Sequence, residues 1–193
     1  MQPSSKILNI IFSAFTFTFF IFGVNQNLKA SRKETGFPLI TNYKTGNYNA
    51  HPQNWGIIQD DRGLMYFANG DGVLVYDGKT WELIELKNKE ATRALAKDAD
   101  GIIYTAGSNE IGYLQPNKYG KPEYISLIDS LGFKDIGVVR SIIIIDKNIY
   151  FRSSEYLIRL NQNGFRYWKA KSTYSISFSY DKDLFIQDEE HGL

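Results

Sequence analysis

The sequence of 193 residues has no cysteine, only two histidines and only five prolines. The absence of cysteine excludes disulfide bonds, thiolate metal sites and a cysteine nucleophile. His51 and His191 lie far from each other and match no recognised metal-binding spacing, so we expect a loop position for the first and a solvated turn for the second. We therefore predict no metal site and no cofactor. No catalytic motif, such as the Gly-x-Ser-x-Gly elbow, occurs either, and no catalytic residue is predicted.

An excess of charge of one sign is also missing. The chain has 22 basic and 21 acidic residues, and without residues 1–30 the balance is 20 to 21. There are no long runs of like charge. This composition gives no electrostatic footprint for nucleic acid, and we predict no nucleic-acid partner.

Long apolar runs are scarce, and the one that stands out is at the N-terminus. Lys6 precedes an apolar run over 7–24, and a short polar stretch then leads to Ala30, which is the pattern of a cleaved signal peptide over residues 1–30. The run is also nearly long enough to span a bilayer, so an uncleaved anchor is the alternative. Either way, we expect an exported protein of the periplasm or cell envelope that contacts membrane only through this segment.

The stretch from Trp55 to Leu86 contains four short apolar runs separated by the polar turns 60–63, 69–72 and 77–80. Each run is too short for a stable helix, and Asp-Gly and Asn-Gly signals between β-rich runs predict a four-stranded antiparallel meander. The middle runs are apolar on both faces, so the sheet should be covered on both sides. Residues 31–53, before this meander, form a polar and aromatic lead-in.

The pattern then repeats. Tyr66, Tyr104, Tyr150 and Phe185 occupy the same place in successive copies, at spacings of 38, 46 and 35 residues. Such a period with four strands per unit is typical of a β-propeller, in which neighbouring blades cover one another. We predict an all-β partial propeller over 54–193, with blades at 54–90, 91–137, 138–171 and a truncated 172–193. About three and a half blades would leave open faces, so we expect the sequence to be the N-terminal piece of a longer protein.

Two Asp-rich turns resemble fragments of calcium-binding loops. These are Asp98 to Gly101 and Asp181 to Asp183. A calcium site needs more oxygen ligands than either turn offers, whereas Asp and Gly are common in hairpin turns because of their backbone preferences. We predict structural turns.

One recurrent position suggests a binding site. In each copy, a large side chain stands two residues before the first apolar residue of the first strand: Trp55, Arg93, Arg140 and Tyr174, before Ile57, Leu95, Ile142 and Ile176. If these strands are innermost, the four side chains surround the entrance of a central channel. Two guanidiniums and two aromatic rings suit a ligand with carboxylate, sulfate or hydroxyl groups and flat sugar faces. The alternative is a role in packing or in hydrogen bonding between blades.

The sequence resembles the two-component-regulator propeller family, the triple-tyrosine sensor proteins of Bacteroidetes-type bacteria. The residues that carry the resemblance are Gly36-Phe37-Pro38, Tyr48, Gln53 to Ile57, Gln59-Asp60, Arg62-Gly63, Met65 to Phe67, Asn69, Gly72 to Leu74, Tyr76 to Gly78, Trp81, Arg93 to Leu95, Gly101 to Tyr104 and Gly112 to Leu114. The resemblance implies an exported sensor region that is followed, in such proteins, by a β-domain, a membrane helix and a cytoplasmic output module.

Three functions are compatible with these observations. The first is a non-enzymatic sensing module of a signalling protein, which binds an extracellular glycan or small molecule and reports to downstream domains or to a second protomer. The second is a secreted propeller enzyme, a polysaccharide lyase or hydrolase with carboxylates drawn from distant loops. The third is a protein-interaction scaffold. Propellers host both binding and catalysis, so the fold alone does not decide between them.

Overall fold

The computed structural model describes residues 40–193, which fold as an all-β chain of three four-stranded antiparallel sheets and one two-stranded sheet. This is the propeller-blade arrangement that the repeats predict. The signal peptide or anchor predicted for residues 1–30, and the part 31–39 of the lead-in, lie outside the described residues. Within 40–193, no helix combines the length and apolarity needed to cross a membrane.

The strands follow one another in chain order within each sheet. Sheet 1 contains β1 (Asn54–Gln59), β2 (Met65–Asn69), β3 (Gly72–Tyr76) and β4 (Trp81–Ile84). Sheet 2 contains β5 (Thr92–Lys97), β6 (Ile103–Gly107), β7 (Glu110–Pro116) and β8 (Pro122–Ser126). A short 3-10 helix, η1 (Ile128–Leu131), leads to sheet 3, which contains β9 (Ser141–Ile145), β10 (Asn148–Arg152), β11 (Tyr156–Asn161) and β12 (Gly164–Lys169). Sheet 4 is the hairpin of β13 (Tyr174–Tyr180) and β14 (Asp183–Asp188).

The turns between the first two strands of sheets 1 and 2 share one geometry. Asp60 Oδ1 accepts the backbone N–H groups of Arg62 and Leu64, both at 2.9 Å. Asp98 Oδ1 accepts those of Asp100 at 3.0 Å and Ile102 at 2.8 Å. These carboxylates close their own turns, as expected from the tendency of Asp to bond nearby backbone. Asp98 therefore belongs to a structural turn, as predicted.

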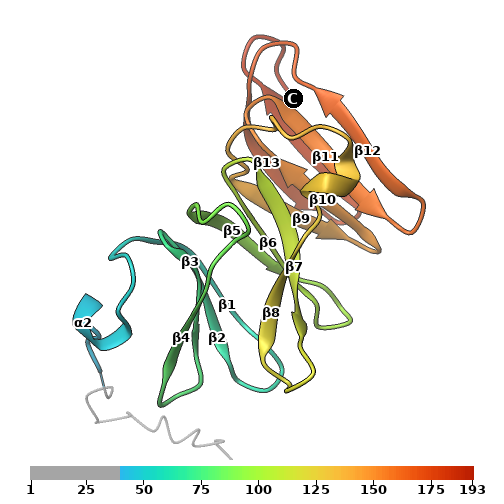
Figure 1. The fold of residues 1–193 in the computed structure, drawn as a ribbon. Helices are drawn as coiled ribbons and strands as arrows, with labels where there is room; N and C mark the ends of the chain where they lie inside the picture. The colour runs from blue at the N-terminus through green and yellow to red at the C-terminus, as the bar shows by residue number, and fades with distance from the viewer. Residues whose placement is uncertain (1–39) are drawn as a thin grey trace, which may run out of the picture. The chain divides into compact units, whose positions relative to one another are not determined.

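The first strands of the four sheets lie side by side in the order β1, β5, β9, β13 (Figure 1). The fourth strand of each complete sheet is the farthest from this row. The first strands are thus innermost, which is the arrangement that the channel-entrance hypothesis requires.

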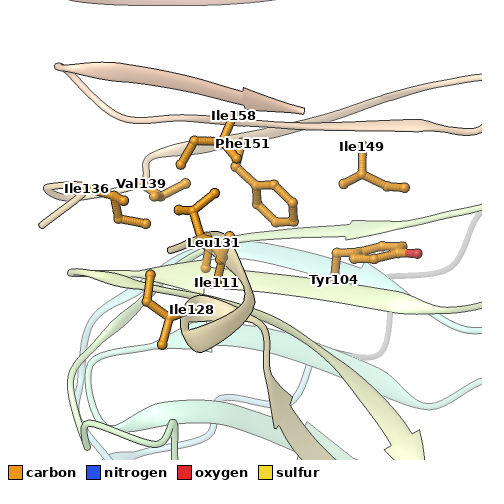
Figure 2. Packing of buried hydrophobic residues seen from close by; sticks show 10 residues of the cluster. Tyr104, Ile111, Ile128, Leu131, Ile136, Val139, Ile149, Phe151 and Ile158 are labelled. Atoms are coloured by element: carbon orange, nitrogen blue, oxygen red, sulfur yellow. The ribbon is translucent and has the colours of Figure 1, made fainter. Parts of the chain in front are cut away.

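Two apolar clusters hold the sheets together. One contains Tyr66, Val73, Val75 and Leu86 from the first repeat with Ile103 and Leu114 from sheet 2. The other joins sheets 2 and 3 around η1 (Figure 2), and its buried members are Tyr104, Ala106, Ile111, Ile128, Leu131, Ile136, Val139, Ile149, Phe151 and Ile158. The repeated aromatic position is therefore an inter-sheet packing position, since Tyr66 is 1% and Tyr104 8% exposed. Phe185 holds the same position in sheet 4 and is 36% exposed.

The outer face of sheet 1 carries an aromatic cluster. The short helix α2 (Thr45–Tyr48) packs near β4, and the rings of Tyr43 and Tyr48 lie 5.2 and 5.4 Å from the ring of Trp81. Trp81 stacks in turn on Tyr76 at 4.3 Å. Residues 43–48 thus cover part of the apolar face that sheet 1 turns away from sheet 2.

Candidate ligand-binding site

Trp55 and Arg93 are the extra residues of two equivalent β-bulges. In sheet 1, Asn54 pairs with Asn69 and Gly56 pairs with the preceding residue, Ala68, so Trp55 has no partner in the ladder. In sheet 2 the pairing passes from Thr92 with Gly107 to Ala94 with Ala106, so that Arg93 is skipped in the same way. A bulge leaves one residue out of the ladder and changes the direction of its side chain, which is why bulges are frequent at sites.

The two bulged residues meet across sheets 1 and 2. The guanidinium carbon of Arg93 lies 3.7 Å from the centroid of the Trp55 ring, well within cation–π range. Both residues are partly buried. A guanidinium that packs its face on an aromatic ring can still donate hydrogen bonds from its edges. The structure therefore brings together two of the four side chains singled out in the sequence.

Arg140 occupies the equivalent place in sheet 3 and is exposed. Its backbone N–H donates to the carbonyl of Arg152 at 3.0 Å, and the next residue, Ser141, pairs with Arg152 in the β9–β10 ladder. Arg140 directly precedes β9, and β9 lies beside β5, so Arg140 stands at the start of the innermost strand next to that of Arg93. We name this end of the sheets, where Trp55, Arg93 and Arg140 lie, the entry end.

Arg152 is a second arginine near Arg140, and it is not among the four residues predicted from the sequence. Its side chain is largely buried, with only 8% of the residue exposed. Nε donates to Ser177 Oγ and Nη1 to the carbonyl of Tyr174, each at 3.3 Å. Burial and, to a lesser degree, the charge of Arg140 lower the pKa of Arg152. Its position corresponds to Ala68 and Ala106 in the first two sheets, so a charged residue replacing a small one in the repeat was the available signal.

The three entry-end arginines lack acidic partners. Within residues 40–193, no carboxylate oxygen lies within 4.0 Å of a nitrogen of Arg93, Arg140 or Arg152. Arg93 is partly buried and Arg152 largely buried, and positive charge that is removed from water and not neutralised by the protein favours the binding of an anion.

Tyr174 does not share the bulge position of Trp55. It pairs with Asp188, as Asn54 pairs with Asn69, and the irregularity follows it, before Ser177. Ser175 is therefore the counterpart of Trp55 in sheet 4. Phe178 pairs with Phe185 as Ile58 pairs with Tyr66, so Ile176 is the counterpart of Gly56 and not of Ile57. The position two residues before Ile176 is therefore Tyr174, one residue before the true counterpart of Trp55. Tyr174 still reaches the site through its carbonyl, which accepts from Arg152. Burial, and then the charge of Asp188, raise the pKa of its hydroxyl.

The histidines lie in turns and loops. His51 Nδ1 accepts the backbone N–H of Gln53 at 3.1 Å, and His191 Nδ1 lies 3.4 Å from Asp188 Oδ1. In the part of the chain that the structure describes, no group of three or more His, Asp or Glu side chains is arranged to hold a metal ion. The entry end is thus a site of guanidiniums, one indole ring and backbone carbonyls, a set that binds anions and flat rings.

Comparison with solved structures places the fold among the propellers. Virginiamycin B lyase from Staphylococcus aureus superposes with a TM-score of 0.54 at 18% sequence identity, over 75% of this chain and 50% of the lyase chain. The extracellular domain of a putative one-component system from B. thetaiotaomicron gives a TM-score of 0.28 at 15% identity, over 69% of this chain and 24% of that domain. No family model and no curated protein match the sequence. The chain spans half the length of the lyase chain that it matches. The structural likeness to the lyase supports an all-β propeller fold.

Proposed function

We propose that this chain is the ligand-binding propeller region of an exported signalling protein of the two-component-regulator type. Its entry end binds an anionic ligand that also offers an apolar C–H face, such as a sulfated or uronate-containing sugar. The observation that carries the proposal is the pair Arg140 and Arg152, which are joined by a backbone hydrogen bond of 3.0 Å and have no carboxylate oxygen within 4.0 Å among the described residues. The family-like residues of the first repeat and the apolar run over 7–24 support the signalling role and the export.

The ligand class follows from the groups at the site. Arg140 and Arg152 offer hydrogen-bond donors that match a carboxylate or sulfate, and guanidinium groups recognise both in a bidentate manner. The Trp55 ring and the Arg93 guanidinium stacked on it offer a flat apolar surface with charged edges. A sugar that carries an acidic group satisfies both halves of the site.

Binding without catalysis is the function that these groups support. Arginine stays protonated at physiological pH, so it cannot serve as a general base or as an ordinary proton donor. Ligand binding would transmit a signal by changing how the propeller packs on downstream domains or on a second protomer. This requires the ligand to bind one packing arrangement of the protein more tightly than the other.

Binding of a sulfated chondroitin disaccharide to the purified chain tests the proposal, with isothermal titration calorimetry as the readout. We expect binding that weakens as salt is raised, and at least a tenfold loss in Arg140→Ala and in Arg152→Gln. Arg166→Ala is the matched control, because Arg166 is exposed on β12, remote from the innermost strands. Affinity that is equal in all these variants would contradict the proposal, and turnover of the disaccharide would favour the enzyme alternative.

A further inference from the structure

A cavity of about 690 Å³ lies at the end of the sheets opposite to the entry end. It is bordered by the β1–β2 turn around Asp60 to Arg62, the β5–β6 turn around Asp100 to Ile102, and the β7–β8 turn from Pro116 to Pro122. We name this the turn end. β1 has six residues, so the cavity and Trp55 are separated by about 17 Å of strand at a rise of about 3.3 Å per residue. The two places are therefore distinct.

The walls of this cavity combine aromatic rings with a few polar groups. Tyr104 and Tyr113 pair across β6 and β7 with ring centroids 6.3 Å apart, on the face of sheet 2 that packs on sheet 3. Ile103 and Leu114 line the cavity from the opposite face of sheet 2, which packs on sheet 1. Figure 2 shows the Tyr104 ring at the margin of the apolar cluster, with its hydroxyl directed away from Leu131 and Ile111. Apolar walls with a small number of convergent polar groups are typical of ligand pockets of this size.

Hydrogen bonds and an ion pair hold the polar groups in place. The Tyr66 hydroxyl, in a residue only 1% exposed, donates to Asp60 Oδ2 at 3.1 Å and accepts from Arg62 Nη2 at 3.2 Å. Lys97 on β5 pairs with Asp61 at 2.5 Å and so ties the turn of sheet 1 to sheet 2. A site whose polar groups are already positioned loses less entropy when a ligand binds.

The charges of the turn end differ from those of the entry end. Asp60, Asp61 and Asp100 line the cavity, while Arg62, its one lining cation, is paired with Asp60 at 2.8 Å. Burial, with a contribution from the charge of Asp98, raises the pKa of Tyr104 to about 12, so its hydroxyl remains neutral. Carboxylates accept hydrogen bonds from hydroxyl groups and repel anions, so these groups suit an uncharged polyol better than an acidic one.

We propose that the turn-end cavity is a second binding site, which takes a neutral saccharide of one or two rings. The sugar's C–H face packs on Tyr104 and Tyr113, and its hydroxyl groups donate to Asp61 and Asp100 and accept from the amide of Gln115. The site is independent of the entry end, and the two sites differ in the charge of the ligand that they select.

Two-dimensional ¹H–¹⁵N NMR on the chain, with chitobiose and cellobiose as probes, tests this inference. We expect at least one of these neutral disaccharides to shift the amides of Ile102, Gln115 and neighbouring turn residues, without shifts at Arg93 or Arg140. Ile102→Trp should weaken the response at least tenfold, because Ile102 is 37% exposed at the cavity and a larger side chain fills it.

The matched control is Ile176→Trp, which makes the same substitution at a 57% exposed site on sheet 4. It should leave the binding unchanged, and circular dichroism should show that both variants keep the wild-type melting curve. The inference is overturned if neither disaccharide shifts the turn-end amides, or if the shifts persist at full size in Ile102→Trp. Loss of chondroitin disaccharide binding in the arginine variants leaves this result unaffected, so the two proposals fail separately.

Discussion

Arg152 of sheet 3 donates a hydrogen bond from Nε to Ser177 Oγ of sheet 4 at 3.3 Å, and Ser177 Oγ lies 3.1 Å from Ser141 Oγ. The buried cation of the candidate site thus sits directly at the junction of two sheets. The same side chain is a neighbour of Arg140 and has no acidic partner within the described residues. An unneutralised buried charge is unfavourable for folding, so we expect a residue placed in this way to serve binding at the expense of stability.

We therefore predict that Arg152→Met stabilises the ligand-free chain while abolishing binding of the sulfated disaccharide. An apolar side chain of similar length removes the desolvated charge, and such replacements are often neutral or stabilising, here by about 1 kcal/mol. Urea denaturation of the two proteins measures the difference. A loss of stability of similar size would show that Arg152 is mainly a structural link between the sheets.

The Trp55–Arg93 contact should contribute more to binding than to folding. Arg93→Ala removes a cation–π contact worth about 0.5–1 kcal/mol at a partly exposed site, so the thermal midpoint should fall by a few degrees at most. The affinity for the sulfated disaccharide should fall at least tenfold. Thermal melts and calorimetry on the same samples separate the two effects, and a large stability loss with unchanged affinity would assign the contact to blade packing.

Gly107 allows the bulge that carries Arg93. A Cβ at this position would lie 2.1 Å from the carbonyl oxygen of Ala91, which is backbone and cannot move independently. Gly107→Ala should cost about 1–3 kcal/mol, as overpacking does, and should also weaken ligand binding by displacing Arg93. Gly46→Ala is the control, since nothing lies within 4 Å of its Cβ position. Equal stability of the two variants would contradict the proposed constraint.

The architecture could be predicted from the sequence because its signals are local. Turns such as Asp60 to Gly63 and Asp98 to Gly101 are defined by hydrogen bonds within four residues, and the repeated Tyr66 and Tyr104 mark an inter-sheet position. A partial propeller follows from turn spacing and repetition alone.

The site was only partly predictable, because it depends on register and on contacts between repeats. The position of Trp55, Arg93 and Arg140 could be found by counting from the first apolar residue. That count fails at Tyr174, where the strand pairing is shifted by one residue. Arg152 belongs to a second strand, and its place next to Arg140 depends on the pairing of β9 with β10, while its side chain is held by contacts with sheet 4. The local apolar pattern of one strand does not encode these contacts.

The cluster between sheets 2 and 3 should dominate the stability of the chain. Phe151 is fully buried in this cluster, and Phe151→Ala should cost about 3–5 kcal/mol through lost burial and the cavity left behind. Phe178→Ala makes the same change at a residue that is 45% exposed on sheet 4, and it should cost much less. Chemical denaturation compares the two. Similar losses of unfolding free energy in the two variants would mean that sheet 4 is packed as tightly as the cluster between sheets 2 and 3.

Asp188 should give sheet 4 a stability that depends on acid pH. Its carboxylate accepts the hydroxyl hydrogen bond of Ser172 and the backbone N–H of Lys171, and these bonds, with Ser172 contributing most, lower its pKa to about 2. A depressed folded-state pKa means that this stabilisation is fully present above the unfolded value of 3.8 and is lost as pH falls from about 4 to about 2. Asp188→Asn should therefore be less stable than wild type at pH 7, and the gap should narrow steadily in thermal melts between pH 4 and pH 2. Asp183→Asn is the matched control, because it removes the exposed carboxylate at the other end of β14. A gap between Asp188→Asn and wild type that stays constant across this window would show that the carboxylate acts by shape and not by charge.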